Sequence, residues 1–117
     1  MVVEYTRYLI SPERRAEFEA MYGKAQKYLQ DSEYCESYEL SHSLEEPDHY
    51  ILRIEWVSVD GHLKGFGTAP SFKDFFASVQ PFIKDIQEMK HYEVLAGVVM
   101  KRDERAERSR SASVKHA

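Results

Sequence analysis

Alternation of apolar and polar residues predicts β-strands in four parts of this chain. Residues 2–10 are rich in Val, Tyr, Thr, Leu and Ile, which suit a pleated, packed surface. Residues 34–44 and 49–57 also alternate, and the turn-forming sequence EEPD at 45–48 separates them, so together they predict a hairpin. A final apolar stretch predicts a last strand over residues 89–100.

The spacing of apolar residues after the first strand is helical. Ser11, Pro12 and Glu13 form a helix start: Ser11 is expected to cap free amides, Pro12 suits the first turn, and Glu13 meets the positive end of the helix dipole. Apolar residues then recur at the three- to four-residue spacing of one helix face: Phe18, Met21, Tyr22, Ala25, Tyr28 and Leu29. The pattern predicts a helix that ends near Asp31.

Two further helices are predicted between the third and the last strand. Ser58 can cap a short helix over residues 58–65, and glycines and a proline break the chain after it. A second amphipathic helix then starts at Ser71 and runs to Val79, and Pro81 is expected to kink or restart it. The aromatic residues of this helix are Phe72, Phe75 and Phe76.

The order β-α-β-β-α(α)-β is that of the split βαβ, or ferredoxin-like, α+β fold. We therefore expect a four-stranded antiparallel sheet with helices on one face, in a single domain over residues 1–100. The segment 101–117 is charged, Ser-rich and free of aromatic residues. It is expected to be a separate C-terminal tail, either disordered on its own or lying as an arm on a neighbouring subunit.

The sheet face without helices is expected to be too apolar for contact with water. Its predicted apolar residues are Val3, Tyr5, Leu9, Ile51 and Val57. A second copy of the chain would cover this face, so the sequence predicts a face-to-face homodimer that forms a dimeric α+β barrel. Arg7, Arg53 and Glu55 would share the face, where opposite charges on adjacent strands can pair.

Composition limits the classes of partner and the compartment. The 43% hydrophobic and 13% aromatic contents are high for one domain of 117 residues, which favours a subunit interface. A net charge of −4 argues against nucleic acid as a partner, because phosphate binding needs a basic face. The single Cys35 allows no internal disulfide and fits a reducing cytoplasm. No apolar run reaches the ~20 residues of a membrane span, and the N-terminus lacks a secretory leader, so we expect a cytoplasmic protein without a membrane partner.

The five histidines are the main candidates for acid–base chemistry. His62 could be a general base, because the ordinary pKa of histidine lies near working pH, or a surface residue of a short helix. His42 could line a pocket on the face of Tyr38 and Leu40, or be a structural histidine. His91 is expected to fix the start of the last strand. No two histidines have H-x-H or H-x-x-x-H spacing, so no metal site is predicted.

Four segments form a set that is found together in one family. They are the strand YILRIEW at 50–56, the turn HLKGF at 62–66, the helix SFKDF at 71–75, and the strand that reaches Glu93. The set resembles the antibiotic biosynthesis monooxygenase family of the dimeric α+β barrel superfamily, over roughly residues 2–98. The resemblance implies a pocket within each subunit, between the sheet and its helices. It also implies, for cofactor-free members, oxidation of phenolic or quinol-like substrates by O₂ alone.

The resemblance also bears on individual residues. The haem-degrading branch has an Asn on the first strand, a Trp at the end of the third strand and a haem-ligating His on the third helix. Thr6, Trp56 and Phe76 stand at those positions here. Since the axial ligand is missing, haem degradation by the family mechanism is not expected. Quinol-oxidising relatives carry a His shortly before the third helix, and His62 lies a few residues earlier than that position.

The sequence thus predicts a cofactor-independent monooxygenase that acts on a small aromatic or quinol-like compound. His62 is the predicted catalytic base, and the hydroxyls of Thr6 and Tyr8 are predicted to orient the substrate. The other residues expected to contact the substrate are Trp56, Tyr22, His42, Phe66 and Phe76. The alternatives are a non-enzymatic dimeric protein that binds a small molecule or acts as an accessory protein, and a haem-handling protein.

Overall fold

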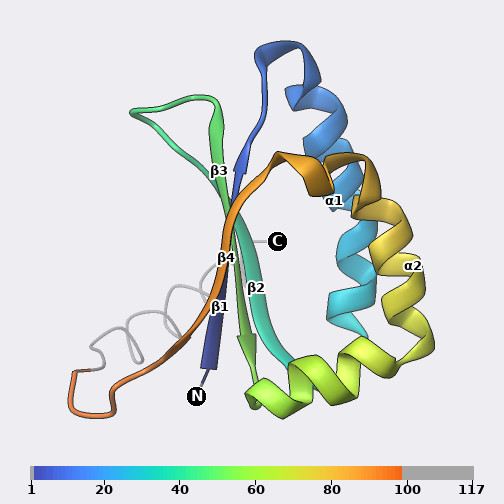
Figure 1. Cartoon of the computed structure of the whole chain (residues 1–117), viewed down its shortest axis with the longest axis vertical. Helices are drawn as coiled ribbons and strands as arrows, with labels where there is room; N and C mark the ends of the chain where they lie inside the picture. The colour runs from blue at the N-terminus through green and yellow to red at the C-terminus, as the bar shows by residue number, and fades with distance from the viewer. Residues whose placement is uncertain (1, 99–117) are drawn as a thin grey trace, which may run out of the picture.

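The computed structural model of this chain describes residues 2–98, which form one antiparallel sheet with helices on one of its faces (Figure 1). The strands are β1 (Val2–Leu9), β2 (Cys35–His42), β3 (His49–Trp56) and β4 (Ile86–Glu93). Their order in the four-stranded sheet is β2-β3-β1-β4, and all neighbours are antiparallel. This topology confirms the predicted α+β, ferredoxin-like fold.

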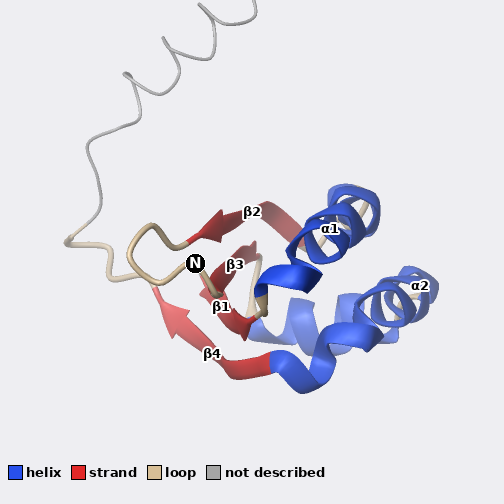
Figure 2. Cartoon of the chain, turned by 90° about the horizontal axis from the view of Figure 1, so that it is seen from above, coloured by secondary structure: helices blue, strands red, loops and turns tan. Residues whose placement is uncertain are grey.

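The helical segments follow the predicted order. A short 3₁₀ helix, η1 (Pro12–Arg14), leads into α1 (Arg15–Gln30), and a π-helical turn η2 (Gly61–Gly65) continues as the 3₁₀ turn η3 (Phe66–Thr68). The helix α2 (Pro70–Val79) is followed by the 3₁₀ segment η4 (Gln80–Asp85). Both longer helices, α1 and α2, lie on the same side of the sheet (Figure 2). No helix within residues 2–98 is long and apolar enough to cross a membrane.

The core lies between α1 and the inner face of the central strands. On α1 the buried residues are Phe18, Tyr22, Ala25 and Leu29, which are the centre of the predicted apolar stripe. On β3 every second residue is buried, namely Tyr50, Leu52, Ile54 and Trp56. The ring of Phe18 packs against Tyr8, Tyr22, Tyr50 and Phe82. The alternation of β3 and the helical period of α1 therefore define one shared core.

The two predicted helix caps have different outcomes. The Ser58 hydroxyl accepts a hydrogen bond from the Gly61 amide at 2.8 Å, which confirms Ser58 as the start of the short helix. Ser11 occupies the predicted N-cap position, and Pro12 and Glu13 follow in the first turn. The side chain of Ser11 makes no capping bond, so only the expected side-chain cap is wrong. A 3₁₀ turn lies between Ser11 and α1, and in this turn the Ser11 carbonyl accepts from the amide of Arg14.

The last strand differs from its predicted range. The sequence predicts residues 89–100, whereas β4 begins at Ile86 and ends at Glu93. The reason is pairing with β1, in which Tyr8 lies opposite Ile86 and Val2 lies opposite Glu93. The apolar residues that follow have no strand beside them, and Leu95 and Val98 are exposed. Residues 99 and 100 and the predicted tail 101–117 lie outside the described residues.

The outer face of the sheet is a mixture of exposed apolar residues and ion pairs. Tyr5, Leu9, Val57 and Tyr92 are each 39–46% exposed, and the rings of Tyr5 and Tyr92 meet edge to face. Arg53 donates a hydrogen bond to Glu55 at 2.8 Å, and Arg7 lies 3.6 Å from Glu88 of β4. Val3 is an exception on this face because it is only 2% exposed. The charged side chains of Arg7 and Arg53 on this face therefore pair with carboxylates of the same chain.

Candidate functional site

A cavity of about 500 Å³ lies between the inner face of the sheet and α1, η2, η3 and α2. Its lining is mainly aliphatic and aromatic, and the residues that contribute are Glu4, Thr6, Tyr8, Tyr22, Leu52, Ile54, Trp56, His62, Leu63, Phe66, Gly67, Phe72, Phe75, Phe76, Val79, Ile83, Ile86 and Met89. This volume and character are those of a small-molecule site. The lining agrees with the predicted pocket between the sheet and its helices.

The cavity has a distinct mouth and floor. Leu63, Phe76 and Met89 line it and are 55%, 42% and 56% exposed, so they form the apolar rim of its opening. Trp56 and Tyr8 line the same cavity and are only 1% and 2% exposed, so they form its floor. A ligand that entered past the rim would therefore lose its hydration before it reached the polar groups of the floor.

The carboxylate of Glu4 is the central polar group of the floor. The indole Nε1 of Trp56 donates to Glu4 Oε1 at 2.9 Å, and the hydroxyl of Thr6 donates to Glu4 Oε2 at 2.9 Å. Glu4 is only 4% exposed, so these donors replace the water that a carboxylate would otherwise require. Because the Thr6 hydrogen serves Glu4, the Thr6 oxygen can offer a substrate only its lone pairs.

His62 lies flat against Trp56 and connects Glu4 to His91. The rings of His62 and Trp56 are stacked, with centroids 4.4 Å apart and an angle of 6° between planes. His62 Nδ1 lies 2.6 Å from His91 Nε2, and His62 Nε2 lies 3.5 Å from Glu4 Oε1. Burial lowers the pKa of His62 below the ordinary 6.5; the nearby Glu4 carboxylate opposes this shift, and His91 adds to it. The imidazole of His62 is therefore neutral at pH 7.

The π-helical turn η2 sets the position of His62. A Cβ built on Gly65 would lie 2.6 Å from the ring of Tyr34, and one on Gly61 would lie 2.7 Å from Val57. Only glycine lets this turn approach the end of the sheet so closely. The two glycines flank His62 at the N- and C-terminal ends of the turn and so bring its ring onto Trp56. A π-helical turn at a functional site is a recurring arrangement.

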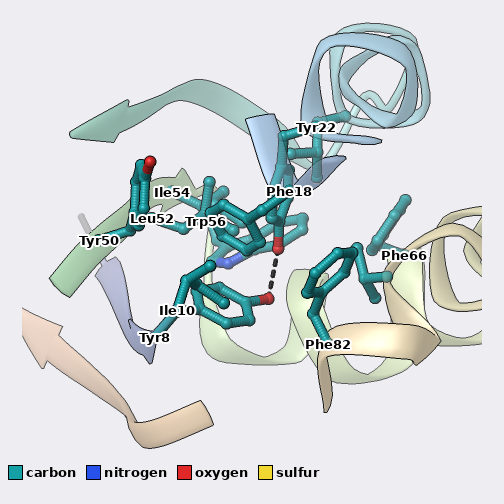
Figure 3. Close-up of a cluster of buried hydrophobic side chains, with 12 residues drawn as sticks. Tyr8, Ile10, Phe18, Tyr22, Tyr50, Leu52, Ile54, Trp56, Phe66 and Phe82 are labelled. Carbon is teal, nitrogen blue, oxygen red and sulfur yellow. Dashed lines mark hydrogen bonds between the residues drawn. The ribbon is translucent and has the colours of Figure 1, made fainter. Parts of the chain in front are cut away.

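A pair of tyrosines forms a second polar point on the cavity wall. The hydroxyls of Tyr8, on β1, and Tyr22, on α1, are 2.5 Å apart, and Figure 3 shows the bond between them beside Phe82 and Phe66. Burial raises the pKa of Tyr8 to about 12 and holds that of Tyr22 well above its ordinary value. Both phenols are therefore protonated at neutral pH.

The predicted site residues fall into two groups. The residues that line the cavity are His62, Trp56, Thr6, Tyr8, Tyr22, Phe66 and Phe76. His42 does not line it: its ring stacks on Tyr50 at 4.3 Å, and its Nε2 lies 2.6 Å from the carbonyl oxygen of Pro47. His42 does share the inner face of the sheet with Leu40, but it lies at the end of β2 near the hairpin loop. The predicted face was right, and the distance along the strand excludes His42 from the cavity.

Sequence reasoning missed two members of the polar cluster. Glu4 alternates with Thr6 and Tyr8 on the inner face of β1, so a carboxylate on an otherwise packed strand was the available signal. His91 was assigned to the start of the last strand, but it lies within β4 directly opposite Glu4. This contact depends on the pairing of β1 with β4, which the local sequence does not reveal.

Glu4, His62 and His91 are also the described residues best placed to hold a metal ion, since one ligand atom of each lies within 4.8 Å of the others. The contact between His62 and His91 fits a direct hydrogen bond more closely. Two nitrogens on one ion at about 2.0–2.1 Å would be about 3 Å apart or more, whereas those of His62 and His91 are 2.6 Å apart. An ion would therefore have to separate the two rings.

Solved structures share this fold. One similar structure is that of a protein from Bordetella bronchiseptica that is assigned as an antibiotic biosynthesis monooxygenase. The two sequences are 26% identical, the alignment covers 80% of this chain and 96% of the other, and the TM-score is 0.67. Proteins with the same assignment from Chloroflexus aurantiacus and Deinococcus radiodurans are 20% and 17% identical. Each alignment covers 86% of this chain and 98% or 99% of the other chain, with TM-scores of 0.65 and 0.63. These two show similarity of fold alone.

The sequence itself matches a family model. No curated protein matches it significantly. The model that does match is described as antibiotic biosynthesis monooxygenase and aligns with residues 1–78. This range includes β1, β2, β3 and His62. Residues 1–78 are more than half of the 117-residue chain. This chain belongs to the antibiotic biosynthesis monooxygenase family.

Proposed function

We propose that the protein is a cofactor-independent monooxygenase that oxidises a small aromatic hydroxy compound, of phenol or quinol type, in the cavity beside Trp56. The observation that carries the proposal is the chain Glu4–His62–His91 on the wall of an otherwise apolar cavity. A buried base next to a largely apolar cavity is the arrangement needed to ionise a weakly acidic aromatic hydroxyl. Membership of the family supports a monooxygenase reaction.

His62 is the proton acceptor in this mechanism. In the working tautomer Nδ1–H donates to His91 Nε2, which leaves the lone pair of Nε2 on the side of Glu4 and the cavity. A substrate hydroxyl placed near Nε2 gives up its proton there. The positive charge that develops on His62 is stabilised by the carboxylate of Glu4, and the Nδ1 proton can move to His91, which does not line the cavity.

The substrate anion then supplies the electrons that reduce O₂. Oxygen adds at an electron-rich ring carbon that carries a hydrogen, and a hydroperoxide forms. Loss of water from this hydroperoxide leaves a carbonyl group, so one oxygen atom enters the product and the other leaves as water. The apolar walls formed by Phe66, Phe72 and Phe75 exclude bulk water while the anion is exposed to O₂.

Oxygen uptake tests the proposal. The protein is incubated with a panel of phenols, naphthols and quinols, and O₂ consumption is recorded against a protein-free blank, with products identified by mass spectrometry. We expect at least one compound to gain one oxygen atom, and ¹⁸O₂ to supply that atom. Saturable binding across the panel without any product would contradict the proposal and favour a small-molecule binding protein instead.

The rate is expected to depend on pH through His62. The neutral form of His62 is the active base, and it predominates above a pKa that burial lowers below 6.5. The value of kcat/KM should therefore fall to half its plateau at a pH below 6.5 and decrease further as the pH is lowered. The measurement uses two substrates of different acidity, because a midpoint that belongs to the enzyme is the same for both. A midpoint above 6.5 for both would exclude His62 as this base.

We also propose that two copies of the chain associate through the outer face of the sheet. Tyr5, Leu9, Val57 and Tyr92 expose apolar surface there, and the ion pairs Arg7–Glu88 and Arg53–Glu55 leave little unmatched charge. A symmetric face-to-face dimer covers this surface with the same surface of a second copy. The resulting barrel would leave each cavity under the helices of its own subunit.

Substitutions on the outer face test this dimer. The wild-type protein should sediment at twice the chain mass of 13.7 kDa. Tyr5→Glu combined with Leu9→Glu places four new charges in a symmetric interface and should weaken dimerisation by at least ~100-fold, the scale expected for removing two central contacts. Leu44→Glu is the matched control, because Leu44 is 93% exposed in the hairpin loop. A wild-type protein that sediments as a monomer at high concentration would contradict the dimer.

A further inference from the structure

The tyrosine pair in the cavity contains one hydroxyl hydrogen without an acceptor. Tyr8 and Tyr22 have one O–H each, and they share a single hydrogen bond of 2.5 Å. Among residues 2–98, neither hydroxyl has another hydrogen-bond partner. Whichever tyrosine donates, the O–H of the other remains available. Since both residues line the cavity, that hydrogen is available to a ligand.

This donor lies at a different part of the cavity from the Glu4–His62 chain. Glu4, Thr6 and Tyr8 occupy alternate inner positions of β1, so the Cα atoms of Glu4 and Tyr8 are about 13 Å apart at 3.3–3.4 Å per residue. The wall between them is largely apolar and includes Leu52 and Ile54 of the neighbouring β3. The Glu4–His62 contact and the tyrosine pair are thus two separate polar points of the lining, with apolar side chains such as Leu52 and Ile54 beside the strand that joins them.

We propose that the Tyr8–Tyr22 pair is a donor site that selects substrates with an acceptor oxygen at the end of the aromatic body remote from the hydroxyl that His62 ionises. The chemical class is a fused or extended aromatic hydroxy compound that carries a carbonyl or ether oxygen at its far end. This inference rests on the proposed function only in placing the hydroxyl of the ligand at His62. A single-ring phenol would reach one of the two polar points but not the other.

The energetic reason is the cost of leaving a buried donor unpaired. An acceptor oxygen completes the hydrogen bonding of the pair, whereas an apolar group of the same shape removes water from the hydroxyl and gives nothing in return. The bond from one tyrosine to the other also polarises the second hydroxyl and strengthens it as a donor. The high pKa values of Tyr8 and Tyr22 keep both hydroxyls protonated and available.

The test compares two probes of equal shape. 6-Methoxy-2-naphthol has an acceptor oxygen at the far end of the ring system, and 6-ethyl-2-naphthol has a methylene group in its place. Binding to the full chain is measured by isothermal titration calorimetry under nitrogen, so that no O₂-dependent turnover consumes the probe. We expect the methoxy compound to bind about 10-fold more tightly, the effect of one net hydrogen bond. Equal affinities in the wild-type protein would overturn the proposal without any variant.

Variants show whether the tyrosine pair causes the preference. In Tyr8→Phe/Tyr22→Phe the ratio of the two affinities should fall to about one, and the ethyl compound should bind at least as tightly as it does to the wild-type protein, because no hydroxyl remains to lose its water. In Tyr38→Phe, the matched control, the ratio should stay at about 10-fold, because the Tyr38 hydroxyl bonds to Gln26 and Gln30 outside the cavity. A 10-fold preference that persists in a folded double variant would overturn the proposal.

The outcome is separable from that of the proposed function. The calorimetric preference requires no oxidation, so it can be found even if no compound consumes O₂. Conversely, oxidation of phenols without a preference for the methoxy probe would support the monooxygenase and reject the tyrosine donor site. Single variants add a check: Tyr22→Phe leaves the Tyr8 hydroxyl without a partner, and this hydroxyl should still donate and retain the preference.

Discussion

Replacement of His62 by alanine should lower the rate of substrate oxidation at least ~100-fold, which is the usual contribution of a general base. His62 is the one histidine among the residues that line the described cavity, and its Nε2 lies 3.5 Å from Oε1 of Glu4, which lines the same cavity. Without it the substrate hydroxyl meets no neutral base on that wall. Turnover is measured as O₂ consumption at saturating substrate, so that a change in kcat is separated from a change in KM.

The matched control is His42→Ala, because His42 is also stacked on an aromatic ring. Its ring lies 4.3 Å from that of Tyr50, much as His62 lies 4.4 Å from Trp56, but His42 is outside the cavity. The control should keep its rate within about 2-fold. Added imidazole should partly restore the His62→Ala variant by occupying the space beside Trp56. A folded His62→Ala protein with an unchanged rate would remove His62 from the mechanism.

Replacement of Glu4 by glutamine should lower the plateau rate by about 10- to 100-fold, the range for losing a hydrogen bond to a charged group. The amide oxygen of glutamine can still accept from Trp56, and the Thr6 hydroxyl can rotate to accept from the amide nitrogen. The fold should therefore be preserved. The carboxylate charge that stabilises protonated His62 is lost, and this loss reduces kcat.

The pH profile separates this electrostatic role of Glu4 from a purely structural one. The carboxylate raises the pKa of His62 against the larger effect of burial, so its removal should move the midpoint of kcat/KM to still lower pH. The rate falls while the active range of pH widens, and misfolding would not produce that combination. Glu55→Gln is the control, since Glu55 bonds to Arg53 on the outer face. An unchanged plateau and midpoint in Glu4→Gln would show that the charge plays no part.

Local periodicity was enough to predict most of the architecture. Alternation placed Glu4, Thr6 and Tyr8 on one face of the first strand, and the helical stripe from Phe18 to Leu29 identified the helix that covers that face. These patterns follow from the two-residue period of a strand and the 3.6-residue period of a helix. The pocket between sheet and helices, with Trp56 and Phe66 among its lining residues, was expected from the resemblance to the family and not from periodicity alone.

Hydrophobicity alone gave the wrong end for the last strand. Val94, Leu95 and Val98 are as apolar as residues of a strand, yet they lie beyond Glu93, where β1 offers no further partner. The length of a strand is set by the neighbour that accepts its backbone hydrogen bonds, and not by its own sequence. The prediction for His42 failed for a similar reason. Alternation correctly placed His42 on the inner face of the sheet, but its position at the end of β2, opposite Tyr50, keeps it out of the cavity.

The sequence by itself determined the fold, the apolar character of the cavity and the presence of a histidine in the turn after β3. Only the tertiary structure decided which groups meet there. The polar chain joins Glu4 of β1, His62 of η2 and His91 of β4, and the donor site joins Tyr8 of β1 to Tyr22 of α1. Each contact depends on strand register and on the close approach that Gly61 and Gly65 allow. Local patterns fix which face a side chain occupies, whereas catalytic distances are fixed by how separate elements pack.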